Sequence, residues 1–272
     1  MSTLKRLFSR RWLLATLLVL AGMALCVRLG IWQLDRLEKR RAFNARVQAQ
    51  IDQPPLLLAD QALDDDLYNA AELQRMEYRP VKVSGTYDFS QEIAIINQSY
   101  GNEWGVHLVT PLVISGTMAG RPEQAILVDR GWIPHQDYQS GDWAKYAEPG
   151  TVVVEGVLRR PQTKAEIGGR TDPTPAPGEA PRAAWNFVNI EQIGKQVSYP
   201  LLGAYIQQAP DPTWTGLPYR SQPEIEITEG SHLSYAIQWF SFAIMLGIGY
   251  PFFIRRQEHR SSQIQQQAAV YD

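Results

Sequence analysis

The side chains best suited to binding a ligand lie at the start of an apolar run near the C-terminus. His232, Tyr235 and Trp239 are three and four residues apart, which places them on one face of a helix. That face offers an imidazole, a phenol and an indole. Two interpretations are open at this point. Such a face can bind a ligand, but Tyr and Trp are also enriched at membrane interfaces, where a His can simply mark the boundary.

Residues 233–254 supply the element that must position this face. They contain no ionisable side chain other than Tyr235 and Tyr250, and Arg255 ends the run. About 20 apolar residues suffice to cross the hydrocarbon core as a helix. Counted back from Arg255 at about 1.5 Å per residue, a core about 30 Å thick ends near Tyr235. We therefore predict a transmembrane helix over 233–254, with His232 at its outer end.

A second apolar run, near the N-terminus, predicts another transmembrane helix over residues 12–32. Basic residues precede this run, and Arg28 is the only charge inside it, close enough to its end to reach the interface. A cleaved signal peptide is the alternative, but residues 21–24 form only a weak cleavage site. We favour an uncleaved helix.

The two predicted helices carry similar residues at the same membrane depth. By the same count along the helix, residues 30–34, which include Trp32 and Gln33, lie level with residues 232–239, which include Gln238 and Trp239. Gly30 would let the two backbones approach closely. If the helices pack together, these aromatic and amide side chains meet in one layer.

The distribution of charge predicts which side of the membrane each segment occupies. Acidic residues precede the second apolar run and basic residues follow it, so its C-terminal end is expected in the cytoplasm. Two spans then place both termini on the same side. We predict cytoplasmic segments at 1–11 and 255–272, and an extracytoplasmic (periplasmic) domain at 33–231, in a protein of the cell inner (plasma) membrane.

The domain between the spans shows the alternation typical of short β-strands. Alternating apolar residues recur between turn residues at 81–87, 92–98, 106–114, 125–133 and 152–158, and shorter strands are expected at 185–190 and 201–208. No long amphipathic helix separates them, which argues against parallel βαβ folding. We predict a mainly antiparallel β domain, either a meander or a small barrel. The acidic run at 64–66 and the Pro-rich stretch at 163–184 are expected to be surface loops.

Composition narrows the function classes. The net charge is −2 in 272 residues, and a nucleic-acid-binding protein usually shows a basic face. Cys26 is the only cysteine, so neither a disulfide within the chain nor a cysteine zinc site can form. The sequence has neither a Gly-x-Ser-x-Gly elbow nor a phosphate-binding glycine loop outside the apolar runs. The residues alone therefore show neither of these two catalytic or nucleotide-binding motifs.

Arg130 and Trp132 form the most unusual segment of the soluble part. A strand that ends in Arg-Gly-Trp places a guanidinium beside an indole, which together can hold a carboxylate or stack on a flat ligand. The alternative is an ion pair between Asp129 and Arg130 and a tryptophan in the core.

Six segments, taken in their order and spacing, resemble the Surfeit locus protein 1 family of cytochrome c oxidase assembly factors. The resemblance covers nearly the whole chain, with two spans around an external β domain. The segments are residues 30–36 (GIWQLDR), 85–87 (GTY), 109–112 (VTPL), 128–134 (VDRGWIP), 156–159 (GVLR) and 232–240 (HLSYAIQWF).

The resemblance implies a non-enzymatic factor that helps insert haem a into subunit I of a haem-copper oxidase. Transient binding of haem a at the outer membrane interface is implied, with oxidase subunit I, haem a synthase and membrane lipid as partners. The family's proposed haem-binding histidine falls on His232, as the iron ligand. Trp32, Tyr235 and Trp239 would offer flat apolar surfaces to the porphyrin. The residues expected to contact partner proteins are Gln33, Gln238, Arg130 and Trp132.

A different function remains compatible with the same sequence. The chain would be a membrane scaffold that docks on the oxidase or on haem a synthase without binding haem. An envelope hydrolase is a weaker alternative, because it requires a nucleophile and a base in a recognisable arrangement, which this sequence does not show.

Overall fold

The computed structural model describes residues 9–58, 76–115, 123–164, 171–173, 180–221, 225 and 227–271, with only the backbone at 262 and 264–271. The chain divides into two compact units. One unit combines the two terminal parts, Met1–Ala45 and Glu226–Asp272, and the other comprises Arg46–Ile225. The predicted acidic loop at 64–66 lies outside the described residues, and the predicted loop at 163–184 is described only in part.

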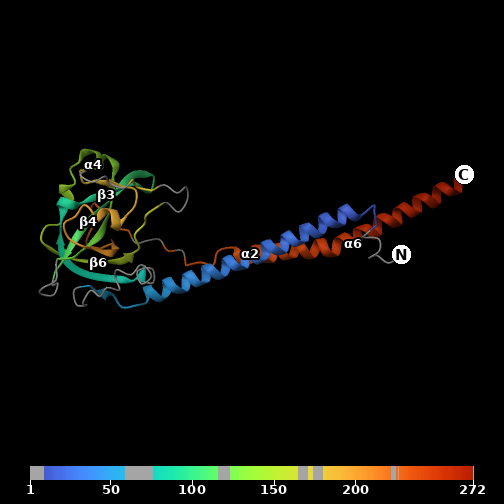
Figure 1. The fold of residues 1–272 in the computed structure, drawn as a ribbon, viewed down its shortest axis with the longest axis horizontal. Helices are drawn as coiled ribbons and strands as arrows, with labels where there is room; N and C mark the ends of the chain where they lie inside the picture. Colours follow the sequence, from blue (N-terminus) through green and yellow to red (C-terminus); the bar gives the residue numbers. More distant parts are fainter. Residues whose placement is uncertain are drawn as a thin grey trace. The chain divides into compact units, whose positions relative to one another are not determined.

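Two long helices make up the terminal unit. They are α2 (Leu13–Ile51), whose last residues belong to the other unit, and α6 (His232–Tyr271). The two helices lie side by side and antiparallel (Figure 1), with contacts at successive levels along their length. The contacting pairs are Thr16 with Tyr250, Met23 with Gly247, and Gly30 with Phe240.

Both helices are long and apolar enough to cross a membrane. Their most apolar 18-residue windows are only 17% buried in α2 and 11% buried in α6. A core helix of a soluble protein would be mostly buried, so these exposed apolar surfaces indicate a membrane protein. Each helix continues beyond the segment predicted to lie in the membrane, so the boundaries 12–32 and 233–254 stay predictions.

Five strands of the other unit close into a small barrel (Figure 1). Around the barrel they are β2 (Pro80–Tyr87), β6 (Thr151–Arg159), β8 (Leu201–Gln208), β5 (Ala125–Pro134) and β4 (Glu103–Ile114). The last strand closes the barrel by pairing with the first, through Gly85–Tyr87 and Leu112–Ile114. The prediction of a mainly antiparallel β domain between two terminal helices is confirmed, and the domain is a barrel.

Further elements extend this barrel. The remaining strands are β1 (Leu56–Leu57), β3 (Ile93–Tyr100) and β7 (Ala184–Trp185), and the short helices are η2 (Phe89–Gln91), α4 (His135–Ser140), η3 (Ala144–Tyr146) and α5 (Ile190–Ile193). The strand predicted at 185–190 is mostly wrong, since only Trp185 of that range belongs to a strand. Asn189 instead caps α5, because its side-chain oxygen accepts from the backbone N–H of Gln192.

The barrel closes where the backbones of β2 and β4 approach at Gly85. A Cβ at this position would lie 2.3 Å from the carbonyl oxygen of Val113. Only glycine tolerates so close an approach. The apolar residues that alternate along β2, including Val81 and Val83, then point inward and join Leu112, among others, in the buried core.

Candidate functional site

His232 is the first residue of α6, and its ring faces α2. Its Nδ1 lies 2.9 Å from the side-chain oxygen of Gln33, and both side chains are partly buried. Gly230, two residues earlier, has a left-handed backbone with φ of 65°. A Cβ at Gly230 would lie 3.8 Å from Nε2 of His232. Because glycine has no side chain, this position adds no side-chain atom beside that edge of the ring.

The segment that leads into α6 is tied to α2 by a second set of contacts. The guanidinium of Arg41 binds both carboxylate oxygens of Glu229, at 2.7 and 2.8 Å. Arg40 and Asn44 donate to the backbone carbonyl of Thr228, at 3.0 and 3.1 Å. These contacts hold the chain against α2 just before His232. The hydrogen bond to Gln33 then holds the His232 ring itself.

The aromatic candidates lie around this pair but mostly face outward. Tyr235 is 49% exposed and Trp32 is 42% exposed. Trp239 is partly buried and packs edge-on against Phe242, with ring centroids 5.9 Å apart. Of residues 232–240 of α6, the small residue Ala236 is the buried one. The exposed rings are therefore available to lipid or to a flat ligand.

The expected layer of two tryptophans and two glutamines forms only in part. Gln33 meets His232, whereas Gln238 is exposed and has no hydrogen-bond partner among the described residues. Trp32 carries the guanidinium of Arg36 over its ring, 5.6 Å from the centroid. Sequence reasoning missed Arg36 and Gly230. Arg36 could have been found from its spacing, since residues four apart on a helix, such as Trp32 and Arg36, lie side by side.

Arg130 lies in the interior of the barrel unit and is fully buried. Its guanidinium donates to Glu92 at 2.8 Å and to Glu148 at 3.0 Å, and it also donates to the carbonyl of Tyr146. Arg220 donates to the same Glu148 at 2.9 Å. Burial raises the pKa of Glu92, and hydrogen bonds from Thr110 and Arg130 oppose that rise. The network joins parts of the chain that are far apart in the sequence.

Trp132 is also buried, with 4% of its surface exposed, and its backbone pairs with that of Tyr219. In this structure Arg130 and Trp132 contact residues of their own unit, which supports the core interpretation of the tryptophan. Whether either residue contacts a partner stays a prediction. The alternative pairing of Asp129 with Arg130 is wrong, because Arg130 pairs with Glu92 and Glu148. Asp129 pairs with His107 instead, at 2.9 Å.

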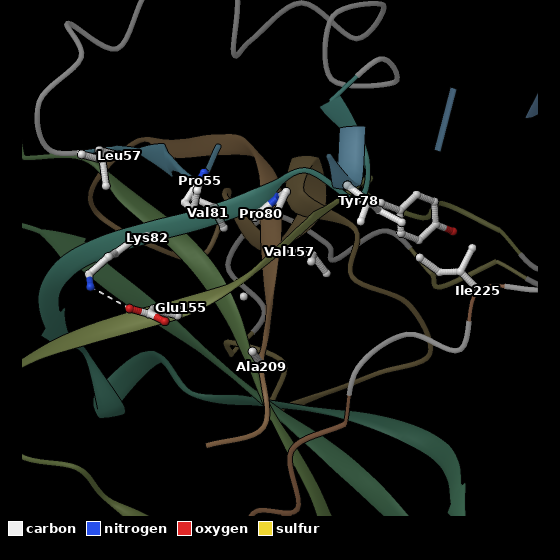
Figure 2. Close-up of a pocket in the computed structure, with 12 residues that line it drawn as sticks. Pro55, Leu57, Tyr78, Pro80, Val81, Lys82, Glu155, Val157, Ala209 and Ile225 are labelled. Atoms are coloured by element: carbon white, nitrogen blue, oxygen red, sulfur yellow. Dashed lines mark hydrogen bonds and ion pairs between the residues drawn. The ribbon is translucent and has the colours of Figure 1, made fainter. Parts of the chain in front are cut away.

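A separate groove of about 600 Å³ lies beside β1, β2 and β6 (Figure 2). Much of its lining is aliphatic, including Pro55, Leu57 and Val157. Its two charged residues, Lys82 and Glu155, pair with each other at 2.7 Å. The two side chains are 47% and 64% exposed, so this ion pair is a surface contact of little energetic weight.

Within the part of the chain that the structure describes, no three His, Cys, Asp or Glu side chains come together to hold a metal ion. His232 is thus a single imidazole at the start of α6, beside α2. A model of the SURF1 family matches residues 20–244, which includes both facing helix segments and the barrel. The chain belongs to the SURF1 family.

Relatives of this SURF1 family chain occur in animals and in bacteria. A SURF1-like protein of Caenorhabditis briggsae is 23% identical over 86% of this chain and 73% of the relative. Surfeit locus protein 1 of Mus musculus is 24% identical over 84% of this chain and 72% of the relative. An uncharacterized SURF1-like protein of Mycobacterium bovis is 26% identical, over 89% of this chain and 83% of the relative.

Proposed function

We propose that this chain is an assembly factor for a haem-copper cytochrome c oxidase, and that it helps to insert haem a into subunit I. Membership of the SURF1 family carries this proposal, because the family is known for cytochrome oxidase assembly factors and these generally act without catalysis. The two candidate membrane spans are consistent with a protein that acts on a membrane-embedded oxidase. Oxidase subunit I, haem a synthase and membrane lipid are the proposed partners, at the inner membrane.

The second part of the proposal is that His232 binds haem a at the outer membrane interface. A single imidazole suits a metal that arrives with its other ligands already in place, as iron does in a porphyrin. The arrangement around His232 fits such a group, since Nε2 makes no hydrogen bond to a described residue and Trp32, Tyr235 and Trp239 lie near His232 in the sequence of the helix pair. The apolar tail of haem a would partition into the adjacent bilayer.

A scaffold that binds no haem is the second candidate function. The observation that favours it is the exposed apolar surface of both helices, together with the exposed amide of Gln238. These surfaces offer packing and hydrogen bonding to the helices of another membrane protein. In this case, replacing Trp32 or Gln238 would prevent co-purification with the oxidase or the synthase, and the purified chain would be colourless.

The test is a reduced-minus-oxidised optical spectrum of membranes from a strain that lacks the gene. We expect loss of most of the haem a signal, restored by the native chain and by Gln238→Ala but not by His232→Ala. If His232→Ala restores the signal fully, the scaffold function is favoured over haem handling. If the deletion leaves the haem a signal unchanged, the assembly function itself is contradicted for that strain.

A further inference from the structure

We infer that Gln33 is a positioning residue that holds His232 in one tautomer, with the proton on Nδ1 and with Nε2 free to bind iron. This inference rests on the proposed haem site at His232 and specifies which ring atom serves it. It assigns Gln33 a role inside the site, whereas the sequence suggested only a contact with a partner protein.

The hydrogen bond between the two helices carries the argument. Nδ1 of His232 lies 2.9 Å from Oε1 of Gln33. An amide oxygen can only accept a hydrogen bond, so Nδ1 must carry the proton that is shared. A neutral imidazole has a single N–H, which leaves a lone pair on Nε2. Metal-binding histidines are commonly oriented in this way, by a partner that accepts from the other ring nitrogen.

Gly230 lies beside the other edge of the ring. Its φ of 65° is a conformation that glycine adopts without strain. A side chain there would begin 3.7 Å from Cδ2 and 3.8 Å from Nε2 of His232, in van der Waals contact with this edge of the ring. No described residue makes a hydrogen bond to Nε2. One edge of the imidazole is therefore engaged and the other is available.

The two residues that form this bond come from different helices, so its geometry depends on how the helices pair. Gly30, one turn from Gln33, gives the close approach to Phe240 on one side of the bond. The contact between Arg41 and Glu229 holds the chain on the other side. A binding group that is fixed before its ligand arrives loses little conformational freedom on binding. Gln33 and His232 have this property.

The first experiment measures the tautomer without haem. The full chain is labelled with ¹⁵N-histidine, purified in nanodiscs, and studied by long-range ¹⁵N–¹H correlation, with His232 assigned through His232→Ala. We expect the native chain and Gln33→Glu to show the Nδ1–H form, because both keep an acceptor. In Gln33→Leu the ratio of the Nδ1–H to the Nε2–H form should fall by about two- to tenfold, as expected for loss of one net hydrogen bond. Gln238→Leu is the matched control and should leave the ratio unchanged.

The inference is overturned if His232 of the native chain carries its proton on Nε2, since the Gln33 amide would then donate to Nδ1. It is also overturned if Gln33→Leu leaves the tautomer ratio unchanged while the helices remain paired. Should Gln33→Leu fail to fold, Gln33→Glu still tests the inference, because its carboxylate must preserve the Nδ1–H form.

The second experiment adds haem a and measures its reduction potential. A stronger acceptor on Nδ1 makes the imidazole a better electron donor to iron, so Gln33→Glu should shift the potential to a lower value than that of the native chain. The results distinguish a failure of the proposed haem site from a failure of the role assigned to Gln33. If haem a does not bind through His232 but the tautomer result holds, the haem site fails and the hydrogen-bond assignment stands. If haem a binds and neither Gln33 variant changes tautomer or potential, the role of Gln33 fails and the haem site stands.

Discussion

At the scale of single residues, Arg130 shows how a buried charge is held in the barrel. Its guanidinium is fully buried and is shared between Glu92 and Glu148, with the rings of Tyr87 and Phe89 about 5 Å away. Burying the guanidinium costs hydration energy, which the paired carboxylates offset. Removing it therefore does more than delete a contact, because it leaves carboxylates in the interior without their cation.

Replacing Arg130 by methionine should lower the free energy of unfolding by about 3–5 kcal/mol, the usual cost of breaking a buried ion pair. Arg160→Met is the matched control, because Arg160 binds Glu77 at 2.7 Å but its side chain is 44% exposed. Loss of an exposed pair costs about 0–1 kcal/mol. Chemical denaturation followed by tryptophan fluorescence measures both. Equal effects of the two variants would contradict the structural role assigned to Arg130.

His107 is a second residue whose behaviour follows from its surroundings. Burial disfavours the charged ring, but the charge of Asp129 and a hydrogen bond to it outweigh that effect, so the pKa of His107 is raised above its ordinary value of 6.5. A pKa that is higher in the folded chain means that protonation stabilises the fold. This stabilisation is complete below the unfolded pKa, and it is lost as the pH rises through the folded pKa.

The stability of the barrel unit should therefore decrease as the pH rises from about 6 through the raised pKa of His107. In Asp129→Asn the attraction is gone and burial alone acts, so the pKa of His107 should fall below its ordinary value and this part of the pH dependence should vanish. NMR titration of the His107 ring, together with denaturation at several pH values, measures both effects. An unchanged pKa in Asp129→Asn would rule out Asp129 as the cause.

At the scale of elements, small residues decide how closely α2 and α6 pair. Gly30 is buried against Phe240, and a Cβ there would lie 2.7 Å from the phenylalanine ring. In a bilayer, helices associate through close packing rather than through the hydrophobic effect, so one small residue has a large influence. The same contact lies one turn from Gln33 and so affects the position of the candidate site.

Gly30→Ala should destabilise the helix pair by about 1–3 kcal/mol, because the added methyl group overpacks the interface. Gly249→Ala adds the same group to α6 at a place where no atom lies within 4 Å, so it should be neutral or stabilising. When Phe240→Ala is added to Gly30→Ala, stability should recover, because removal of the ring makes room for the added methyl group. Thermal unfolding of the purified chain in detergent measures the three variants. The packing argument fails if the two glycine variants behave alike.

At the scale of the whole molecule, the charges flanking the two spans predict which side of the membrane each segment occupies. The basic residues that follow the second span predict cytoplasmic termini, and the barrel unit then lies outside. This orientation would place His232 at the outer interface, where the proposed function needs it. The orientation is a prediction that labelling of single cysteines can test, since Cys26 is the only native cysteine and is replaced by serine.

In the Cys26→Ser background, Asp142→Cys in the barrel unit and Gln263→Cys in α6 each introduce one thiol at an exposed position. A membrane-impermeant maleimide added to spheroplasts should label the Asp142→Cys variant at once. The Gln263→Cys variant should be labelled only after the membrane is permeabilised. The opposite labelling pattern would show that the orientation in the membrane is the reverse of the predicted one. Rapid labelling of both variants in intact spheroplasts would contradict the pair of membrane spans.

Much of the fold can be predicted from the sequence, because the responsible patterns are local. The apolar runs that became α2 and α6, and the alternation along β2, β4, β5 and β6, are visible over a few consecutive residues. The positions of His232 and Gln33 near the ends of these runs follow from counting along a helix. Turns and helix caps are harder to predict from the sequence. The strand expected at 185–190 was mostly wrong, because Asn189 caps a helix that begins at Ile190.

Only the tertiary structure decided which distant residues meet. The sequence placed residues 30–34 level with residues 232–239, and the packing of the two helices decided that Gln33 meets His232, 199 residues away. Closure of the barrel between β2 and β4, the parallel pairing of β5 with β8, and the sharing of Arg130 between Glu92 and Glu148 depend on such contacts too. The physical reason is that hydropathy and periodicity fix the face and depth of a residue. Helix rotation and strand register, which select its partner, are set by packing across the whole fold.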